Sequence, residues 1–469
     1  MLNNCFGVFK SLFKNVLSTF LVLIMVFCFT ACGEKYDESD LPEYPADAFE
    51  ISGLWAPNEL TEEAFRQYKD AGFNVLSFTN HDALPRTSQN QYYIGSERTM
   101  EALELCKKVG IDVYIAYGAS WFNRANEGDE YFDVTPFSNH NYYGEYMDII
   151  RGIHINDEPN KEEMDVISAE KLIDDFKKVY PDKKYIVNLI PLTANASGWG
   201  YPTYQHLLDD YAERIMSQFE NPYISLDLYP FHVQAPNTDV DLAQNYKMIA
   251  ETAKKYNAEQ TFILQSGTGA EFEDSLSEGD MRWQVYAAIA YGADNLQYYC
   301  YSVPKGIDYN YCMLEKDDKT PSDLYYYVKE INAEVQKFAN VVLAYDWQEV
   351  IGVWGETSDT FRISSVAGWD ENDPTKFENA KHYVESKGTR DLLITRFEDE
   401  QYGEGYMFVN FADRNNANTV TATFKDCGAV AIYGGEDYSG IPKIVELDKE
   451  GKFTLELAYG EGVFVTPII

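Results

Sequence analysis

Short apolar segments alternate with longer amphipathic ones over residues 50–342, and this alternation constrains the fold more than any other feature of the chain. The short segments have the composition of β-strands, and those between them have the length and periodicity of helices. Strands that alternate with helices form a parallel sheet. Eight strands with the segments that connect them fit in about 290 residues, close to the roughly 250 that a closed (β/α)8 barrel typically needs. We therefore predict a (β/α)8 barrel (TIM barrel, class α/β) over residues 50–345.

The predicted barrel strands are 50–55, 74–78, 112–117, 149–155, 184–189, 223–228, 261–264 and 295–299. The predicted helices are 61–71, 96–109, 161–180, 203–219, 241–256, 278–291 and 321–342. After residue 345 the helical pattern fades, and short strands separated by turn residues are expected at 349–354, 360–365, 391–396, 405–411, 418–424, 429–433, 443–447, 452–457 and 462–467. This pattern predicts a β-sandwich domain over residues 346–469.

The N-terminus has the pattern of a secretory signal: Lys10 and Lys14 precede an apolar run at 16–29, and small residues follow. The segment CFTAC at 28–32 resembles the bacterial lipoprotein lipobox, which implies cleavage after residue 31 and a lipid on Cys32. We therefore expect a signal peptide at 1–31, an acidic tether at 32–49, and a protein held outside the cytoplasm on a bacterial membrane by its lipid anchor alone. An uncleaved membrane anchor is the alternative.

The net charge bears on nucleic-acid binding, and the cysteines bear on metal binding and disulfide formation. A net charge of −38 argues against nucleic acid, whose phosphates would be repelled. Beyond residue 32 the cysteines Cys106, Cys300, Cys312 and Cys427 match no CxxC metal pattern. In an oxidising compartment Cys300 and Cys312 either pair or remain buried thiols. The oligomeric state stays open.

Polar and aromatic residues gather where the predicted strands end, and in a (β/α)8 barrel these ends share one mouth. The strongest signal is Asp157-Glu158-Pro159 at the end of the fourth strand; an acidic helix N-terminus is the plainer interpretation. Asp227 ends the sixth strand. Because neighbours alternate along a strand, Asp157 need not enter the mouth with Glu158. The residues expected to bind substrate are Trp55, Asn80, Tyr117, Trp121, Asn188, Tyr229, Gln265 and Tyr298.

Aromatic faces combined with amides and carboxylates suit a carbohydrate substrate, and glycosidic cleavage needs an acid and a second group. The sequence offers no glycine-rich phosphate loop at this mouth, no Lys or Arg cluster and no His pair at metal spacing. Phosphoryl transfer and zinc hydrolysis are therefore disfavoured, and we expect neither metal nor other cofactor.

The segment GIHINDEP at 152–159 resembles the fourth-strand motif of clan-A glycoside hydrolases. SLDLYP at 225–230 resembles a sixth-strand tip of related barrels. INAEV at 331–335, with the β-rich segment after it, resembles the layout of family 42-type β-galactosidases. The resemblance implies that Glu158 is the general acid/base. It also implies a Glu nucleophile at the seventh strand, where this chain has Gln265.

The amide of Gln265 is not an anionic nucleophile, so it cannot take the role of the glutamate. Three other mechanisms of glycosidic cleavage are open. In the first mechanism Asp227 activates a water molecule, and the configuration at the anomeric carbon inverts. Alternatively, a substrate 2-acetamido group attacks while Asp157 orients it, as in hexosaminidases with adjacent Asp-Glu pairs. In the third route Glu271, Glu273 or Asp274 folds back from the following loop. A non-catalytic glycan-binding barrel is the alternative function, and a structural lipoprotein without a glycan site is a third. The sugar, its linkage and exo or endo action stay open.

Overall fold

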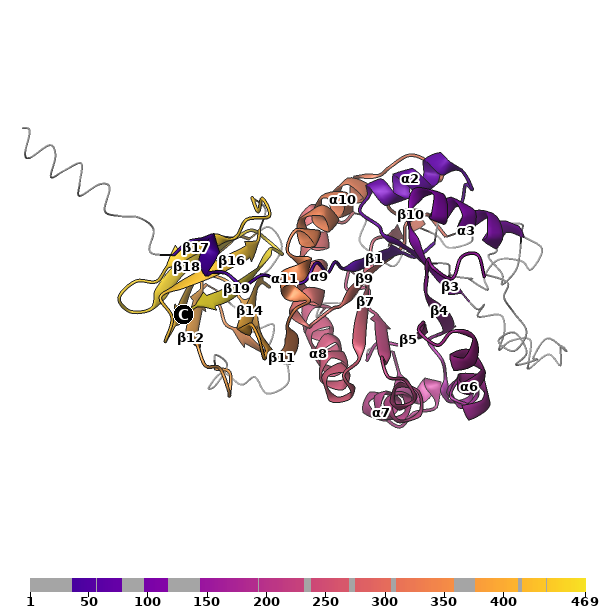
Figure 1. The fold of residues 1–469 in the computed structure, drawn as a ribbon, viewed down its shortest axis with the longest axis horizontal. Coiled ribbons are helices and arrows are strands. Elements are labelled where there is room, and N and C mark those ends of the chain that lie inside the picture. Colours follow the sequence, from indigo (N-terminus) through magenta and orange to yellow (C-terminus); the bar gives the residue numbers. More distant parts are fainter. Residues whose placement is uncertain are drawn as a thin grey trace, which may run out of the picture.

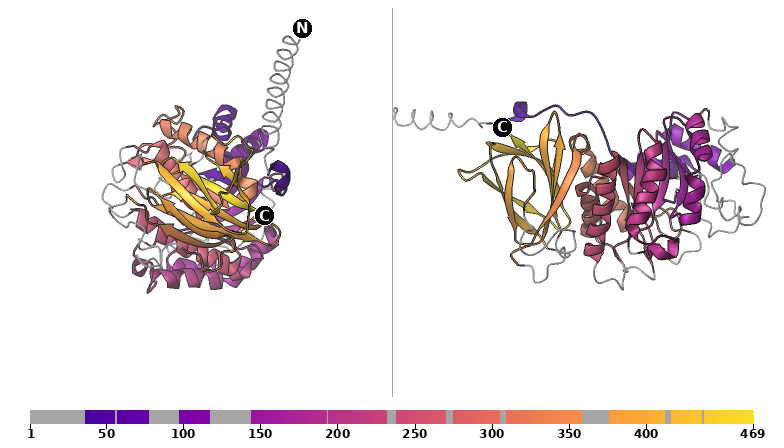
Figure 2. Two further views of the ribbon diagram at one scale, coloured as in Figure 1. Left: turned by 90° about the vertical axis from the view of Figure 1, so that its left-hand side faces the viewer. Right: turned by 90° about the horizontal axis from the view of Figure 1, so that it is seen from below.

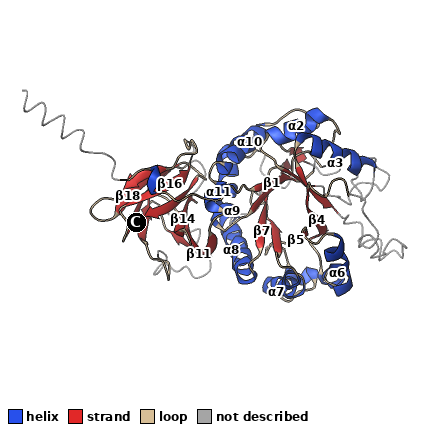
Figure 3. Cartoon of the chain, viewed as in Figure 1, coloured by secondary structure: helices blue, strands red, loops and turns tan. Residues whose placement is uncertain are grey.

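The computed structural model describes residues 36–55, 57–77, 97–116, 144–192, 194–231, 238–269, 275–304, 309–357, 376–411, 416–435 and 437–469. Eight parallel strands form a closed barrel, and the chain then forms two antiparallel sheets (Figure 1, Figure 3). The predicted fold class, a (β/α)8 barrel followed by a β-sandwich, is confirmed. The predicted signal peptide at 1–31 and Cys32 lie outside the described residues.

The barrel strands follow the chain in order, and β1 pairs with β9 to close the ring. They are β1 Glu50–Gly53, β2 Val75–Ser77, β3 Asp112–Ala116, β4 Ile150–Asp157, β5 Lys184–Leu189, β6 Tyr223–Asp227, β7 Glu259–Gln265 and β9 Asn295–Tyr299. The described helices are α2 Glu62–Asp70, α3 Glu97–Val109, α5 Lys161–Ile167, α6 Glu170–Val179, α7 Tyr204–Arg214, α8 Thr238–Tyr256, α9 Glu278–Ala290, α10 Asp323–Gln336 and α11 Ala339–Val342. Short 3-10 turns lie at η1 Glu38–Asp40, η2 Ala196–Trp199 and η3 Met216–Gln218.

The region predicted as one helix at 161–180 is two helices, α5 and α6. Asn160 caps α5 through a capping box with Glu163. The Ser168 hydroxyl donates to the carbonyl oxygen of Met164 (2.7 Å), and Ala169 then takes an extended conformation (φ −61°, ψ 128°). Helix α5 therefore ends at Ser168, whose N–H and hydroxyl both donate to Met164, and the extended Ala169 separates it from α6.

A network of salt bridges and hydrogen bonds fills the N-terminal end of the barrel. Lys184 Nζ lies 2.5 Å from the Glu50 carboxylate and also pairs with Glu259. The Tyr114 hydroxyl donates to Glu50 in the same network. A salt-bridged plug at this end leaves the other end, where the strands finish, as the place for a site.

The β-sandwich consists of a six-stranded sheet, ordered β11-β13-β14-β19-β16-β17, and a three-stranded sheet, ordered β12-β15-β18. Its strands are β11 Asp346–Val353, β12 Tyr383–Gly388, β13 Leu392–Asp399, β14 Gly403–Asn410, β15 Asn418–Phe424, β16 Ala429–Gly434, β17 Lys443–Glu446, β18 Lys452–Leu457 and β19 Gly462–Ile468. Strand β12 was not predicted, because its sequence YVESKG lacks regular apolar alternation. The strand predicted at 360–365 lies outside the described residues.

The six-stranded sheet is covered on both faces, by the small sheet on one side and by barrel helices on the other (Figure 1). Phe411 packs on Trp283 of α9, with ring centroids 5.0 Å apart. Residues 36–49, predicted as a tether, run along the sandwich to β1 (Figure 2), and the Tyr44 ring packs 4.9 Å from that of Tyr402. One apolar cluster therefore joins the barrel to the barrel-facing side of the six-stranded sheet, and a second cluster fills the space between the two sheets of the sandwich.

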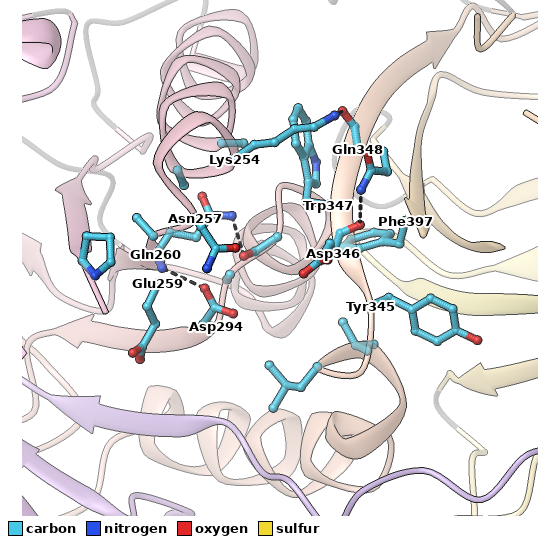
Figure 4. A pocket seen from close by; sticks show the side chains of 18 of the residues that line it. Lys254, Asn257, Glu259, Gln260, Asp294, Tyr345, Asp346, Trp347, Gln348 and Phe397 are labelled. Carbon is cyan, nitrogen blue, oxygen red and sulfur yellow. Dashed lines mark hydrogen bonds between the residues drawn. The ribbon is translucent and has the colours of Figure 1, made fainter. Parts of the chain in front are cut away.

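A crevice of about 400 Å³ lies between the N-terminal ends of β7 and β9 and strand β11 (Figure 4). Asp294, Asp346 and Trp347 are among its lining residues. Burial raises the pKa of Asp294 to about 7. The crevice lies at the opposite end of the barrel strands from Asp157 and Asp227.

Candidate active site

A bulge near the end of β4 sets the direction of the acidic side chains. Between His154 and Asn156, β4 advances two residues while the paired strand β5 advances one, from Ile186 to Val187. A bulge of this kind shifts the following side chains relative to strict alternation and is common beside active sites. Immediately after the strand, Glu158 adopts φ +50°, a conformation uncommon for a residue other than glycine.

Asn188 at the end of β5 joins the carboxylates of two other strands. Its Nδ2 donates to Asp157 Oδ1 (3.1 Å) and to Asp227 Oδ1 (2.9 Å), and its Oδ1 accepts a bond from the Ser225 hydroxyl (3.1 Å). Asn188 is 2% exposed, so the amide is held rigidly. The structure thus brings together Asp157, Asn188 and Asp227, which the sequence places on three successive strands.

The main chain of Glu158 is held on both sides. Its N–H donates to the carbonyl oxygen of Asn188 (2.9 Å), and its own carbonyl oxygen accepts from Trp199 Nε1 (3.0 Å). Trp199 ends η2 in the connection after β5, and the sequence analysis did not identify it. Its position beyond a strand end was a usable signal, but its contact with Glu158 was not visible in the sequence.

The Glu158 carboxyl lies in an environment that favours its protonated form. Burial is the main cause, and the charges of Asp227 and then Asp157 add to it, raising the pKa of Glu158 to about 8. Glu158 is therefore largely protonated at neutral pH and able to donate a proton. The hydrogen bond from Asn188 places Asp157 beside Asp227, and the charges of both acids act on Glu158.

Asp227 is 9% exposed, and burial followed by the charge of Asp157 raises its pKa to about 7. Hydrogen bonds from Asn188, from its own backbone and from Tyr229 oppose this rise. Because the two acids interact, their titration belongs to the pair. Near neutral pH, one protonated carboxyl beside one ionised carboxylate is the favoured state of the pair.

Aromatic side chains line the same region. The Tyr229 ring stacks on Tyr299, with centroids 5.2 Å apart and 29° between planes, and Tyr309 meets Tyr299 edge-on at 6.1 Å. Trp55 follows β1 in the same apolar cluster, is 9% exposed and adopts φ +58°. The structure places Tyr229 and Trp55 beside the strand ends, where the sequence predicted them.

One predicted substrate contact, Tyr298, faces away from the mouth, and another, Gln265, is held by backbone groups at the strand ends. Tyr298 is fully buried between the barrel and α10, and its hydroxyl donates to Asn332 Oδ1 (2.9 Å). Its neighbour Tyr299 faces the mouth instead, as the two-residue period of a strand requires. Gln265 is 2% exposed, and its side chain accepts from the N–H of Phe231 (2.9 Å) and donates to the carbonyl oxygen of Gly267 (3.2 Å). The Gln265 amide therefore fixes two loops.

The remaining predicted residues Asn80, Tyr117, Trp121, Glu271, Glu273 and Asp274 lie outside the described residues. Within the part that is described, no group of three or more His, Cys, Asp or Glu side chains has the arrangement of a metal site. No helix in that part is both long and apolar enough to cross a bilayer.

No protein-family model matches the chain, and no curated protein matches it. Among solved structures, a catalytic mutant of a GH42 β-galactosidase from G. stearothermophilus matches with a TM-score of 0.56 and 9% identity, over 91% of this chain and 100% of that one. A GH30 endoxylanase from Clostridium papyrosolvens C71 matches with a TM-score of 0.43 and 12% identity, over 90% and 98% of the two chains. The first match confirms the predicted resemblance to family 42-type barrels at the level of the fold.

Proposed function

We propose that this protein hydrolyses glycosidic bonds in a glycan, with Glu158 as the general acid. The observation that carries the proposal is the cluster at the C-terminal end of the barrel, where Asn188 hydrogen-bonds both Asp157 and Asp227, and where burial beside these two acids raises the pKa of Glu158. Glycoside hydrolysis needs one carboxyl group that acts as an acid and a second that acts as a base, and environments that give the two groups different pKa values meet this requirement. The stacked Tyr229 and Tyr299 offer apolar surface for a sugar ring beside them.

In the proposed reaction Glu158 transfers its proton to the leaving glycosidic oxygen as the bond to the anomeric carbon breaks. Asp227 accepts a proton from a water molecule, whose oxygen bonds to the anomeric carbon. Asn188 holds Asp227 and Asp157 in position throughout. Gln265 takes no part as a nucleophile, because an amide bonded to backbone groups has neither the charge nor the freedom to attack. This assignment makes the enzyme inverting.

The substrate-assisted route uses the same cluster differently. There a 2-acetamido group of the substrate attacks the anomeric carbon while Asp157 orients it, and the configuration is retained. The hydrogen bond from Asn188 to Asp157 supports such a role, since it fixes the direction of that carboxylate. The identity of the sugar separates the two routes.

The test is a hydrolysis screen of aryl glycosides and oligosaccharides, N-acetylhexosaminides included, with the product anomer followed by NMR. Cleavage with inversion supports Asp227 as the base, and cleavage restricted to acetamido sugars with retention supports substrate assistance. Binding of a glycan without turnover of any donor contradicts the hydrolase and supports a glycan-binding barrel. The amide of Gln265 at the seventh strand, where the resemblance implies a glutamate nucleophile, favours that second function.

The pH profile of kcat/KM is expected to be a bell with its maximum between about pH 7 and pH 8. Raised pKa values near 7 for Asp227 and near 8 for Glu158 set the two limbs. Below the lower value the base is protonated, and above the higher value the acid has lost its proton. Initial rates in constant-ionic-strength buffers from pH 4 to pH 10 measure the profile. A plateau that extends below pH 5 would show that Asp227 is not the base.

We also propose that the chain is exported and anchored by a lipid on Cys32. Support comes from the order of Lys10 and Lys14, the apolar run at 16–29 and the cysteine after small residues. Cys32→Ser is expected to shift the protein from the detergent phase to the aqueous phase in Triton X-114 partitioning. An unchanged partition would contradict lipidation at this residue.

A further inference from the structure

Cys300 and Cys312 lie next to each other in the apolar cluster that also contains Tyr299 and Tyr309 of the candidate site. Their Sγ atoms are 3.2 Å apart, both residues are fully buried, and 12 positions of sequence separate them. We propose that the two thiols form a disulfide in the exported protein, which fixes the segment after β9 to the end of that strand. The proposal rests on the export proposed above and is independent of the hydrolase chemistry.

Each cysteine is held by a different part of the fold. The Cys300 carbonyl oxygen accepts from the Ser266 hydroxyl (3.4 Å) of the segment after β7. The Cys312 carbonyl oxygen accepts from the Ser322 hydroxyl (2.5 Å), and the Cys312 N–H donates to the carbonyl oxygen of Leu314 (3.1 Å). Two independently anchored cysteines whose sulfurs are in contact need only small side-chain movements to bond.

The surroundings of the pair favour a structural bond. The sulfurs lie in an apolar cluster with Leu54, Trp55, Ile263 and Tyr309, which excludes water from them. A Cβ on Gly267 would lie 3.1 Å from Cys312 Sγ, so the packing on that side is tight. A disulfide in such surroundings is shielded from reducing agents and persists in an oxidising compartment.

The bond would stabilise one wall of the mouth. Cys312 directly follows β10 (Tyr309–Tyr311), which pairs antiparallel with β8 (Thr268–Gly269). Tyr309 at the start of β10 packs on Tyr299, the residue before Cys300. Linking Cys300 to Cys312 therefore holds Tyr309 against Tyr299, the residue that stacks on Tyr229.

The reaction is balanced with a thiol–disulfide oxidant as the co-reactant. Each thiol loses one proton and one electron, and the two sulfurs form one bond. The oxidant's own disulfide takes up both electrons and two protons and becomes two thiols. Oxidised glutathione serves as this oxidant in vitro.

Peptide mapping tests the proposal on the full chain, expressed with its own N-terminal segment, denatured in the presence of an alkylating reagent and then digested. Trypsin cuts after Lys305, so Cys300 lies on the peptide 283–305 and Cys312 on 306–316. The expected result is a linked pair of these peptides in most molecules, lost on reduction, with Cys106 and Cys427 alkylated once the chain is denatured. The matched control Cys106→Ala, at another buried cysteine, retains the linked pair.

Alkylation of both Cys300 and Cys312 in the denatured exported protein would overturn the proposal. A second measurement does not depend on a variant that folds poorly: reductant is expected to lower the melting temperature of the wild type by several degrees. The double variant Cys300→Ala/Cys312→Ala should show no such response, and an equal response would count against the bond. A linked pair in a protein without hydrolase activity would retain the disulfide and reject only the enzymatic function.

Discussion

Replacing Glu158 by glutamine is expected to lower kcat/KM on a natural glycan by about 10²–10⁴-fold, the contribution of a positioned general acid. Glutamine has nearly the same shape and stays neutral, so binding of the sugar should change little. The loss should therefore lie in kcat. Steady-state kinetics on the substrate identified by the screen measure both parameters.

The matched control is Glu162→Gln, the same substitution at an exposed position in the first turn of α5. It should retain wild-type rates. The pKa of Glu158 is raised in the fold, so the stability it contributes is present at low pH and decreases as pH rises through about 8. The neutral side chain of Glu158→Gln does not ionise, so the variant does not lose this stability at high pH. It should melt at a higher temperature than the wild type at pH 9. Full activity of Glu158→Gln would exclude Glu158 as the acid.

Asp227→Asn is expected to produce a second large loss, again about 10²–10⁴-fold in kcat, because the base that activates water is removed. The acidic limb of the pH profile should disappear in the residual activity. The carbonyl oxygen of the introduced amide would still accept a bond from Asn188 Nδ2, so the fold should remain intact. Kinetics from pH 4 to pH 10 together with thermal melting check this expectation.

Asp157→Asn separates the two routes. With Asp227 as the base, Asp157→Asn should cost far less than Asp227→Asn. A larger loss for Asp157→Asn, limited to acetamido sugars, would contradict the inverting assignment and support substrate assistance. Asp209→Asn on the exposed face of α7 is the matched control and should leave the rate unchanged.

The architecture was predictable because the barrel strands are short apolar segments and the helices show the apolar periodicity of an amphipathic helix. The bounds of β5 and β9 were predicted to the residue, since turn residues flank both strands. Glu158, Asp157, Asn188 and Asp227 were found by one rule, that polar residues at the ends of parallel strands share the barrel mouth. Their convergence in the structure follows from the barrel topology.

The remaining features depend on partners that the sequence does not show. The bulge in β4 is set by its pairing with β5 and decides where Asp157 points. Tyr299 was missed in favour of Tyr298, although counting in steps of two from the interior residue Asn295 would have selected it. Trp199 contacts Glu158 across a connection of irregular structure, and no periodicity predicts such a contact.

The most direct test of the central claim, that Glu158 protonates the leaving group, is the dependence of the Glu158→Gln defect on the leaving group. A dinitrophenyl glycoside departs without a proton, whereas a phenyl glycoside or natural saccharide needs one. We predict that the variant loses about 10²–10⁴-fold in kcat/KM on the poor leaving group and less than about 10-fold on the dinitrophenyl glycoside of the same sugar. Equal losses on both substrates would contradict the assignment of Glu158 as the acid.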